Sequence, residues 1–600
     1  MKTLFLSPSR RLVWFFALAA CGAFLVIPSA FAQVSESLVT VGSPASPFPQ
    51  NKQNEPAVAI NPIAPNVAAA GVNDEIDVEA CNNGPDNDCP FTPGVGVSGI
   101  YFSLDGGNSW EQPTYTGWTA RDCLGVPGTS TDQCSPHVGP IGTLPRYYEN
   151  GLVADGDPAV AFGPKPGPNG FSWANGWRLY YANLTSNFSS ERAEFAIRGF
   201  EAIAVSRLDD ENFAAALAGD NNAWKAPVIV SRQNAALFSD HEQIAVDDAE
   251  SSPFFGNVYV CNAAFRGQER SPNALPEPIV LDYSSDGGET WRQTQLSAAT
   301  NNNQGFGRQD CQVNTDSRGT VYVFWQGGSP QTRQNTIFMT RSFDGGKHFE
   351  RPPVPVTTFD ACGLFDFATG FTFDGVAGAR DGSFPSVDIA NGAPTGIDAP
   401  DTLVMTWCDG PTPTSDEPGP NEEAIVQYST DRGSSWTRIG NGAEAGDRPD
   451  FPAIAISPDG GDVYLTYDAF LQPWQTTTAN PRLMQGVVRH ADFGGAGTSF
   501  ATVHRGAVGD ARGSSTNSLA AEFLGDYNYA FATNEFAVAV WNDVRDAADC
   551  PAIDAYRQAN VNFLTGQSQT APTKPAPNIV CPPTFGNTDI YAAAITDPTP

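Results

Sequence analysis

The chain has 600 residues, 41% of them hydrophobic, and a formal net charge of −33 at pH 7. Its apolar content is sufficient for a large buried core and excludes disorder along the whole length. The excess of acidic side chains repels phosphate backbones and anionic lipids, which argues against binding to nucleic acid or to an acidic membrane surface. The 58 glycines and 49 prolines predict many turns, as expected for an all-β fold.

The N-terminus has the layout of a signal peptide, which we assign to residues 1–32. Basic residues precede the apolar run Leu12–Ile27, and the small-x-small site Ala30–Ala32 follows it, so cleavage is expected before Gln33. The apolar run is short for a membrane-spanning helix, and no stop-transfer signal follows it. Lipoprotein cleavage at Cys21 is the less favoured alternative, because it would leave apolar residues exposed. We therefore expect a secreted or periplasmic protein with no membrane span.

Cysteine usage agrees with export. The chain has 11 cysteines, and all except Cys21 follow the signal peptide, which leaves an even number for disulfide bonds. A zinc or redox site has little support, because no Cys-x-x-Cys motif occurs. Closeness in sequence and the spacing of the repeats predict five pairs: Cys81 with Cys89, Cys123 with Cys134, Cys261 with Cys311, Cys362 with Cys408, and Cys550 with Cys581.

An alternating apolar strand recurs along the chain after an acidic or polar residue and often a proline. Seven such phrases begin at Asn54, Gly156, His241, Arg308, Ser383, Asp450 and Gly525. A second strand rich in β-branched and aromatic residues usually follows, at Val258, Val321, Leu403, Val463 and Ala537. No amphipathic stretch with helical period and caps stands out. The pattern predicts an all-β array of repeated sheets.

A second phrase, Ser-x-Asp-x-Gly-x-x-aromatic, occurs in four copies: "SLDGGNSW" from Ser103, "YSSDGGETW" from Tyr283, "SFDGGKHF" from Ser342 and "STDRGSSW" from Ser429. Four copies cannot each be an active site. The aspartate is suited to accept backbone N–H groups in a turn, and the glycine permits a left-handed conformation. We therefore predict structural turns between the third and fourth strands of a sheet, braced by Asp105, Asp286, Asp344 and Asp431.

These phrases resemble Asp-boxes, also called BNR repeats, and the chain is similar to the sialidase-like superfamily of β-propellers over nearly all of its mature length. The resemblance implies a single propeller over residues 51–600, with long loop insertions and with residues 33–50 as an N-terminal segment that closes the last blade. Sialidases of this superfamily usually have six blades. The seven strand-opening phrases favour seven four-stranded blades here, with six as the alternative.

Strand direction then separates two faces. The boxes lie on one face, whereas the starts of first strands and the ends of second strands lie on the other, around the central channel, where propellers generally bind ligands. The resemblance implies an aspartate acid/base, a tyrosine nucleophile polarised by a glutamate, and three arginines that grip a carboxylate. The catalytic candidates are Asp74, Tyr527 and Glu242, with Glu522 as an alternative partner of Tyr527, and the substrate-binding candidates are Arg308, Arg380 and Arg448.

One position departs from the family pattern. Asn54 stands where family enzymes carry the first arginine, and with Glu55 beside it this should weaken the grip on an anion. Two-carboxylate glycosidase chemistry is an alternative, with Asp240 and Glu242 near Asp310. The same carboxylates could bind Ca²⁺, although no cofactor is required and no other metal site is expected.

The leading hypothesis is an exported, monomeric, sialidase-like propeller that acts on a glycan or glycoconjugate as an exo-glycosidase of the exo-α-sialidase type. The alternative is a non-catalytic propeller that binds glycans or a protein at the cell surface, which Asn54 favours. The sequence does not reveal the sugar or the linkage.

Overall fold

The computed structural model describes residues 34–41, 52–79, 92–123, 135–188, 201–231, 237–266, 277–299, 308–329, 332, 334–362, 364–366, 370–372, 382–410, 421–473, 475 and 477–599. The expected signal peptide, Arg380, Cys81, Cys89 and Cys134 lie outside these residues. Within them, no helix combines the length and the apolar character that a membrane crossing requires.

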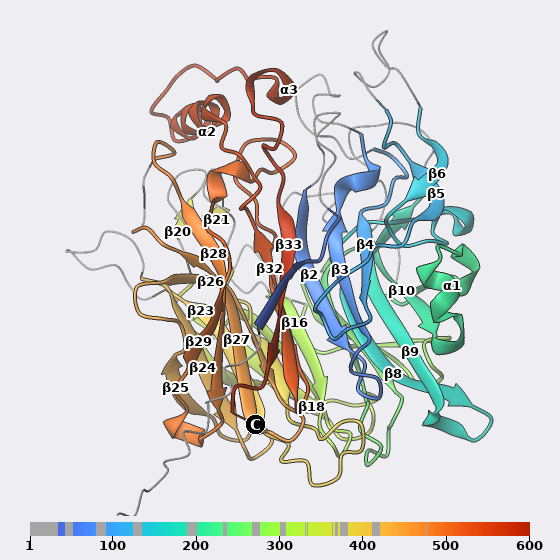
Figure 1. Ribbon diagram of the computed structural model, residues 1–600. Coiled ribbons are helices and arrows are strands. Elements are labelled where there is room, and N and C mark those ends of the chain that lie inside the picture. Colours follow the sequence, from blue (N-terminus) through green and yellow to red (C-terminus); the bar gives the residue numbers. More distant parts are fainter. Residues whose placement is uncertain are drawn as a thin grey trace, which may run out of the picture. The chain divides into compact units, whose positions relative to one another are not determined.

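Seven antiparallel sheets form the blades of a β-propeller (Figure 1). In chain order, the first blade contains β2(Gln53–Ile60), β3(Ala68–Asp74) and β4(Ser98–Ser103), and the second contains β8(Ala159–Gly167), β9(Gly170–Asn187), β10(Ala202–Asp209) and β11(Val228–Ile229), with β7(Leu152–Ala154) also paired to β9. The third blade contains β12(Leu237–Val246), β13(Val258–Arg266), β14(Ile279–Ser284) and β15(Arg292–Gln295), and the fourth contains β16(Arg308–Thr315), β17(Val321–Gly328), β18(Asn335–Ser342) and β19(Val354–Phe359). The fifth blade contains β22(Ser386–Ile389), β23(Leu403–Asp409), β24(Glu423–Ser429) and β25(Thr437–Asn441), and the sixth contains β26(Arg448–Ile456), β27(Asp462–Phe470), β28(Leu483–Asp492) and β29(Ala501–Arg505), with β30(Gly509–Asp510) also paired to β28.

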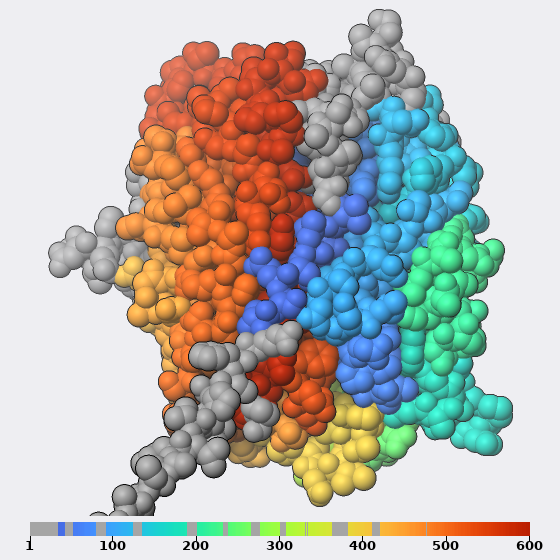
Figure 2. All heavy atoms as spheres, viewed as in Figure 1, coloured from blue at the N-terminus to red at the C-terminus, as the bar shows by residue number. Residues whose placement is uncertain are grey.

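The seventh blade combines the two ends of the described chain. It contains β31(Tyr529–Ala532), β32(Phe536–Asp543), β33(Asp589–Thr596) and, as its fourth strand, β1(Val34–Leu38), which pairs antiparallel with β33. In Figures 1 and 2 the blue N-terminal segment accordingly lies against red C-terminal residues. This pairing covers the outer edge of β33 and gives the seventh blade its fourth strand. The predicted seven blades and the all-β class are confirmed.

Smaller elements connect the blades. They are the hairpins β5(Tyr115–Thr119)–β6(His137–Ile141) and β20(Leu364–Asp366)–β21(Gly370–Thr372), and the helices α1(Phe213–Leu217), α2(Pro551–Leu564) and α3(Pro577–Val580). Short 3-10 turns cover Glu75–Asp77, Tyr148–Asn150, Asp210–Asn212, Asn221–Ala223, Gly495–Gly497 and Ala511–Gly513.

The core lies between neighbouring blades, because each sheet packs both of its faces. The second strands show this most clearly: Trp325, Trp407 and Trp541 are fully buried in β17, β23 and β32. Near-continuous apolar runs in these strands, rather than strict alternation, are what a sheet covered on both faces requires.

The four Ser-x-Asp-x-Gly turns follow the third strands and share one hydrogen-bond pattern. In the first copy, Ser103 Oγ accepts the N–H of Gly107 at 2.8 Å and donates to Asp105 Oδ1 at 2.8 Å, while Asp105 Oδ1 accepts the N–H of Ser109 at 2.9 Å. The same bonds recur at Ser284 with Asp286, Ser342 with Asp344 and Ser429 with Asp431.

The second glycine position of each turn also packs against the preceding blade. Gly107 has φ +90°, and a Cβ there would lie 2.7 Å from Cγ2 of Val538 in the seventh blade. The third copy is similar, because a Cβ on Gly346 would lie 2.9 Å from the Tyr259 ring in the third blade. The turns therefore have two structural roles: their hydrogen bonds hold the connection between the third and fourth strands, and their second glycine position packs against the preceding blade.

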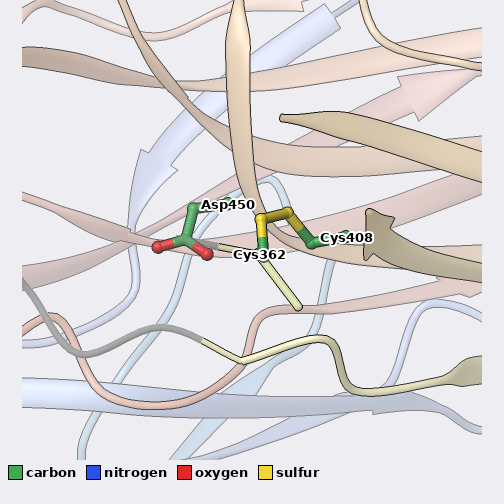
Figure 3. A group of neighbouring side chains, drawn as sticks. All are labelled: Cys362, Cys408 and Asp450. Carbon is green, nitrogen blue, oxygen red and sulfur yellow. A yellow bond between two sulfur atoms is a disulfide. The ribbon is translucent and has the colours of Figure 1, made fainter. Parts of the chain in front are cut away.

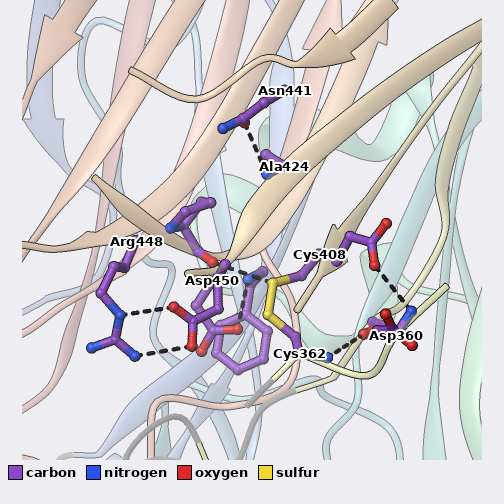
Figure 4. The surroundings of a disulfide bond; sticks show 12 residues. Asp360, Cys362, Cys408, Ala424, Asn441, Arg448 and Asp450 are labelled. Carbon is purple, nitrogen blue, oxygen red and sulfur yellow. Dashed lines mark hydrogen bonds and ion pairs between the residues drawn. A yellow bond between two sulfur atoms is a disulfide. The ribbon is translucent and has the colours of Figure 1, made fainter. Parts of the chain in front are cut away.

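Three of the predicted disulfides are confirmed: Cys261–Cys311, Cys362–Cys408 and Cys550–Cys581. The first joins β13 of the third blade to β16 of the fourth. Figure 4 shows the surroundings of the second, which joins β23 to the segment that precedes the fifth blade. Three disulfides fit an extracellular or periplasmic protein. The remaining two predicted pairs include cysteines outside the described residues.

Helix α2 corrects the expectation that no helical segment occurs. It begins with Pro551, whose fixed φ suits a first helical position, and it lies in the insertion between β32 and β33. Its buried residues Ile553, Asp554, Arg557 and Val561 follow helical spacing, but two of them are charged. Arg557 donates to the carbonyls of Ser514 and Ala521, so a polar network replaces the apolar stripe that identifies most amphipathic helices.

Candidate functional site

A cavity of about 330 Å³ lies among the first strands of all seven blades. Its walls carry apolar side chains such as Val58, Ile244 and Ile454. At the end where the first strands begin, its lining consists of His241, Phe384, Phe451, Asp526 and Tyr527. We call this end the first-strand mouth. The Ser-x-Asp-x-Gly turns, which follow the third strands, lie at the opposite end of the sheets.

A β-bulge interrupts the first strand of several blades near this mouth. The ladders of β2, β12, β16 and β26 with their partners each shift register there. Five non-glycine residues at the bulges, or at the corresponding position before β8, have left-handed φ values of +48° to +60°: Glu55, Asp157, His241, Asp310 and Phe451. Such a conformation costs free energy for any residue with a Cβ. Its repetition at one end of the channel marks this end as a functional candidate, because bulges re-aim side chains.

His241 and Asp310 form a buried ion pair, with 2.5 Å between Nδ1 and Oδ1. Burial alone lowers the pKa of His241, but the charge and hydrogen bond of Asp310 outweigh it and raise this pKa to about 9. The imidazole is therefore cationic at neutral pH. Its ring lies 5.0 Å from the ring of Tyr527 and 5.0 Å from that of Phe384, so it fixes the aromatic side chains of the mouth.

Of the sequence-predicted pair Tyr527 and Glu242, Tyr527 lines the cavity, whereas Glu242 does not, although its charge acts on Tyr527. The Tyr527 side chain is buried, and its hydroxyl has no hydrogen-bond partner among the described residues. Burial, followed by the charges of Asp157 and Glu55, raises the pKa of Tyr527 well above its usual range, and Glu242 contributes to the same shift. The nucleophile and its partner of the sialidase-like hypothesis therefore occupy one electrostatic environment.

Glu242 is the more unusual of the two residues. It is 1% exposed, and neither carboxylate oxygen has a hydrogen-bond partner within the described part of the chain. Burial, then the charges of Asp157, Asp240 and Glu201, raise the pKa of Glu242 well above 4.5. An ionised carboxylate in such surroundings would cost several kcal/mol, so the surroundings favour the protonated form.

Glu242 belongs to a larger acidic cluster between the second and third blades, formed by Asp155, Asp157, Glu201, Asp240 and Glu242. Glu201 is also 1% exposed, and its two oxygens have no hydrogen-bond partner among the described residues. Burial raises the pKa of Asp155 to about 7. Carboxylate oxygens are ligands that Ca²⁺ prefers, but no three residues of this cluster have the spacing of metal ligands among the described residues. The sequence analysis missed Asp155 and Glu201, because neither residue lies within a repeated phrase: Asp155 directly precedes the phrase that begins at Gly156.

Asp74, the predicted acid/base, lies in a different environment. It ends β3 and is fully buried, and it is not among the residues that line the cavity. Its carboxylate accepts hydrogen bonds from Gln53 at 3.0 Å, Gln112 at 2.8 Å and the hydroxyl of Tyr101. The geometry assigns Asp74 to a hydrogen-bond network that holds the first blade together. Glu522, the alternative partner of Tyr527, forms an ion pair with Arg482.

The two described arginine candidates are each engaged by a glutamate from the preceding blade. Arg448 forms a two-pronged ion pair with Glu422, at 2.7 and 2.9 Å (Figure 4). Arg308 donates its backbone N–H to Glu277 at 3.2 Å, and the Glu277 charge also acts on its guanidinium. When a carboxylate already binds both arms of a guanidinium, as Glu422 does at Arg448, its negative charge neutralises the arginine and leaves little positive charge for a substrate anion. Arg380 lies outside the described residues.

Two groups of side chains have the spacing of metal ligands. One comprises Cys362, Cys408 and Asp450 (Figure 3), but its sulfur atoms form a disulfide and offer no thiolate. The other comprises Asp462, His490 and Asp492, at the end of the sixth blade that faces away from the first-strand mouth. Within it, His490 Nε2 lies 2.8 Å from Asp462 Oδ1, so these two side chains already hydrogen-bond to each other.

Comparison with known proteins finds structural likeness without sequence likeness. No family model matches the chain, and no curated protein does. Among solved structures, the Hadza microbial sialidase Hz136 aligns with a TM-score of 0.37 and 12% identity. The alignment covers 66% of this chain and 65% of that sialidase, so this chain spans just under two thirds of its length. The α-L-arabinofuranosidase Arb93A from Fusarium graminearum aligns with a TM-score of 0.37 and 12% identity, over 75% of this chain and 94% of its own. A leech intramolecular trans-sialidase aligns with a TM-score of 0.38 and 12% identity, over 73% of this chain and 68% of its own. With TM-scores below 0.5, the fold is defined by the sheets themselves.

Proposed function

We propose that the protein is an exported propeller that hydrolyses glycosidic bonds at the first-strand mouth, with Glu242 as the proton donor. The observation that carries this proposal is the buried Glu242 carboxyl, which follows the cavity-lining His241, has no hydrogen-bond partner among the described residues and feels the charges of three further acidic residues. A glycosidic oxygen needs a proton as its bond to the anomeric carbon breaks. A carboxylic acid that stays protonated at neutral pH supplies that proton.

A second carboxylate must complete the reaction, and Asp157 and Asp240, whose charges act on Glu242, are the candidates. In the proposed sequence, Glu242 protonates the leaving-group oxygen while the second carboxylate either attacks the anomeric carbon or takes a proton from the attacking water. With a nucleophilic carboxylate, water then cleaves the glycosyl–enzyme bond and returns a proton to Glu242. Tyr527, whose pKa is raised, keeps its hydroxyl proton and donates a hydrogen bond to the substrate or to the second carboxylate.

The surroundings favour an uncharged sugar over a sialoside. Phe384, Phe451 and Tyr527 present aromatic faces in the cavity lining, and the nearby carboxylates can accept hydrogen bonds from sugar hydroxyls. Arg308 and Arg448, which a sialoside would need, are held by Glu277 and Glu422. The exo-α-sialidase version of the proposal therefore depends on Arg380.

A second candidate function is glycan binding without catalysis. Asn54 favours it, because its side chain stands at the position of the first family arginine and accepts a hydrogen bond from Asn73 instead of offering a charge. Calcium is not needed for proton donation by Glu242.

The test is turnover of fluorogenic glycosides by the secreted protein, with a panel of neutral sugars and one α-sialoside. We expect hydrolysis of a neutral substrate and a loss of about 10²- to 10⁴-fold in Glu242→Gln, the usual contribution of a general acid. Glu250→Gln, which changes an exposed glutamate at the far end of the channel, is the matched control. Saturable binding with no product would establish the binding function instead. Turnover that is undiminished in Glu242→Gln would show that Glu242 is not the donor.

A further inference from the structure

A cationic pocket lies beside the Ser-x-Asp-x-Gly turn of the third blade, at the end of the sheets opposite the first-strand mouth. It encloses about 460 Å³ and is lined by Arg146, Arg207, Lys225 and Glu289 together with the amides Asn212 and Asn222. Arg178 lies directly behind it, because its Nη1 donates to the carbonyl of Gly287 at 2.7 Å. Four cations thus gather in a chain that has 33 basic and 66 acidic residues.

The two acidic groups of this region are not equivalent. Asp209 is committed to the protein, since it accepts a fork from Arg178 at 2.5 and 3.0 Å and lies 3.3 Å from Lys225 Nζ. Glu289 is the second, and it lies 2.9 Å from Arg207 Nη1 and 3.9 Å from Arg178 Nη1. Asp209 therefore compensates Arg178 and Lys225, whereas Arg207 is compensated by Glu289.

The Arg207–Glu289 contact joins a buried cation to an exposed anion. The Arg207 side chain is 3% exposed, whereas that of Glu289 is 52% exposed. Neither Nε nor Nη1 of Arg207 makes an aligned hydrogen bond to any described residue. The third nitrogen, Nη2, donates to the carbonyl of Ala226 at 3.3 Å. An exposed ion-pair partner contributes little and exchanges readily with solvent, whereas a buried guanidinium with two unsatisfied nitrogens is costly. An external oxyanion could therefore replace Glu289 and satisfy Arg207 better.

We propose that this pocket binds an anionic substituent of an acidic glycan, a sulfate ester or a carboxylate, in place of Glu289. Arg207 would take the oxyanion through its fork, and Lys225 and Arg146 would add charge at the walls. The amides of Asn212 and Asn222 are suited to the hydroxyls of the attached sugar, and the volume is within the range of small-ligand sites. Glu289 occupies the position where the other three turns carry Asn108, Lys347 and Ser434, so the turn itself does not require it. This site is independent of the function proposed for the first-strand mouth.

The test compares Glu289→Gln with Glu250→Gln, both exposed glutamate-to-glutamine changes that add one unit of net charge. Binding is measured by calorimetry with inorganic sulfate, a chondroitin sulfate oligosaccharide, an oligogalacturonate and a neutral oligosaccharide. We expect Glu289→Gln to bind the acidic oligosaccharides about two- to fivefold more tightly than Glu250→Gln, because a competing surface ion pair is removed. Lys225→Met should weaken the same binding by a similar factor, and added salt should weaken it in all variants.

The ligand panel separates the sources of the anion. Tighter binding of the chondroitin sulfate alone assigns the site to sulfate esters, and tighter binding of both acidic glycans assigns it to sugar oxyanions in general. Equal affinities in Glu289→Gln and Glu250→Gln would overturn the proposal. A response to inorganic sulfate with no gain from an attached sugar would overturn the assignment to a glycan. Melting temperatures give a second readout, since Glu289→Gln should be less stable than wild type without ligand and gain more from the acidic oligosaccharide.

Discussion

Replacing Gly107 by alanine tests whether the Ser-x-Asp-x-Gly turns join one blade to the next. Gly107 has φ +90°, so an alanine there adopts a left-handed conformation that costs about 1–2 kcal/mol. Its Cβ would also lie 2.7 Å from Val538 Cγ2, and overpacking of this kind costs about 1–3 kcal/mol more. We therefore expect Gly107→Ala to lower the free energy of unfolding by about 2–5 kcal/mol in total.

Gly151→Ala is the matched control, because Gly151 has φ +71° but its Cβ would meet no atom within 4 Å. Only the conformational cost applies there, so the difference between the two variants reports the contact with the seventh blade. Denaturant unfolding of the disulfide-intact protein would give both midpoints. In the double variant Gly107→Ala/Val538→Ala, the combined loss should be smaller than the sum of the single losses. Equal losses in Gly107→Ala and Gly151→Ala, or strict additivity in the double variant, would refute the contact.

Three further predictions concern charge and covalent links. The raised pKa of Glu242 means that its protonated form stabilises the fold fully below about pH 4.5. This contribution is lost as the pH rises through the folded-state pKa, so stability should fall as the pH rises above about 4.5. Glu242→Gln should flatten part of that fall in melting temperature while it abolishes turnover, and an unchanged pH profile would contradict a protonated Glu242. Arg448→Met should lower the free energy of unfolding by about 3–5 kcal/mol, because it leaves Glu422 buried without its ion-pair partner. The double variant Arg448→Met/Glu422→Gln should recover much of this loss in the same denaturation assay. Replacing Cys261 and Cys311 by serine should lower the free energy of unfolding by about 2–4 kcal/mol. A decrease no larger than that of a pair of serine substitutions on the surface would show that the third and fourth blades do not depend on this disulfide.

Much of the architecture was visible in the sequence because it repeats. The alternating apolar phrases predicted seven blades, and the cysteine spacing predicted the pairs Cys261–Cys311, Cys362–Cys408 and Cys550–Cys581. Helix α2 was not predicted, because its buried face includes Asp554 and Arg557 and therefore lacks an apolar stripe.

The site was predictable in position but not in partners. Tyr527 and Glu242 were selected because first strands begin at the channel mouth. Tyr527 lines the cavity there, whereas Glu242 is buried next to His241 and does not belong to the lining. The engagement of the arginines depends on residues that no local pattern connects, since Glu277 is 31 residues from Arg308 and Glu422 is 26 residues from Arg448. For Asp74 the decisive partners Tyr101 and Gln112 come from β4 and the segment after it. Local phrases locate a side chain on a blade, whereas its charge state depends on neighbours from other strands.

The pairing of β1 with β33 makes the last sheet a product of both ends of the chain. Thr40 lies within hydrogen-bond distance of Asp589, 549 residues away, so the circle of blades can close only after almost the whole polypeptide is available. Six blades can assemble in the order of synthesis, but the seventh remains incomplete, with an unpaired strand edge, until the N-terminal strand docks. Proteolytic removal of β1 would therefore take one strand from the seventh blade rather than shorten a tail.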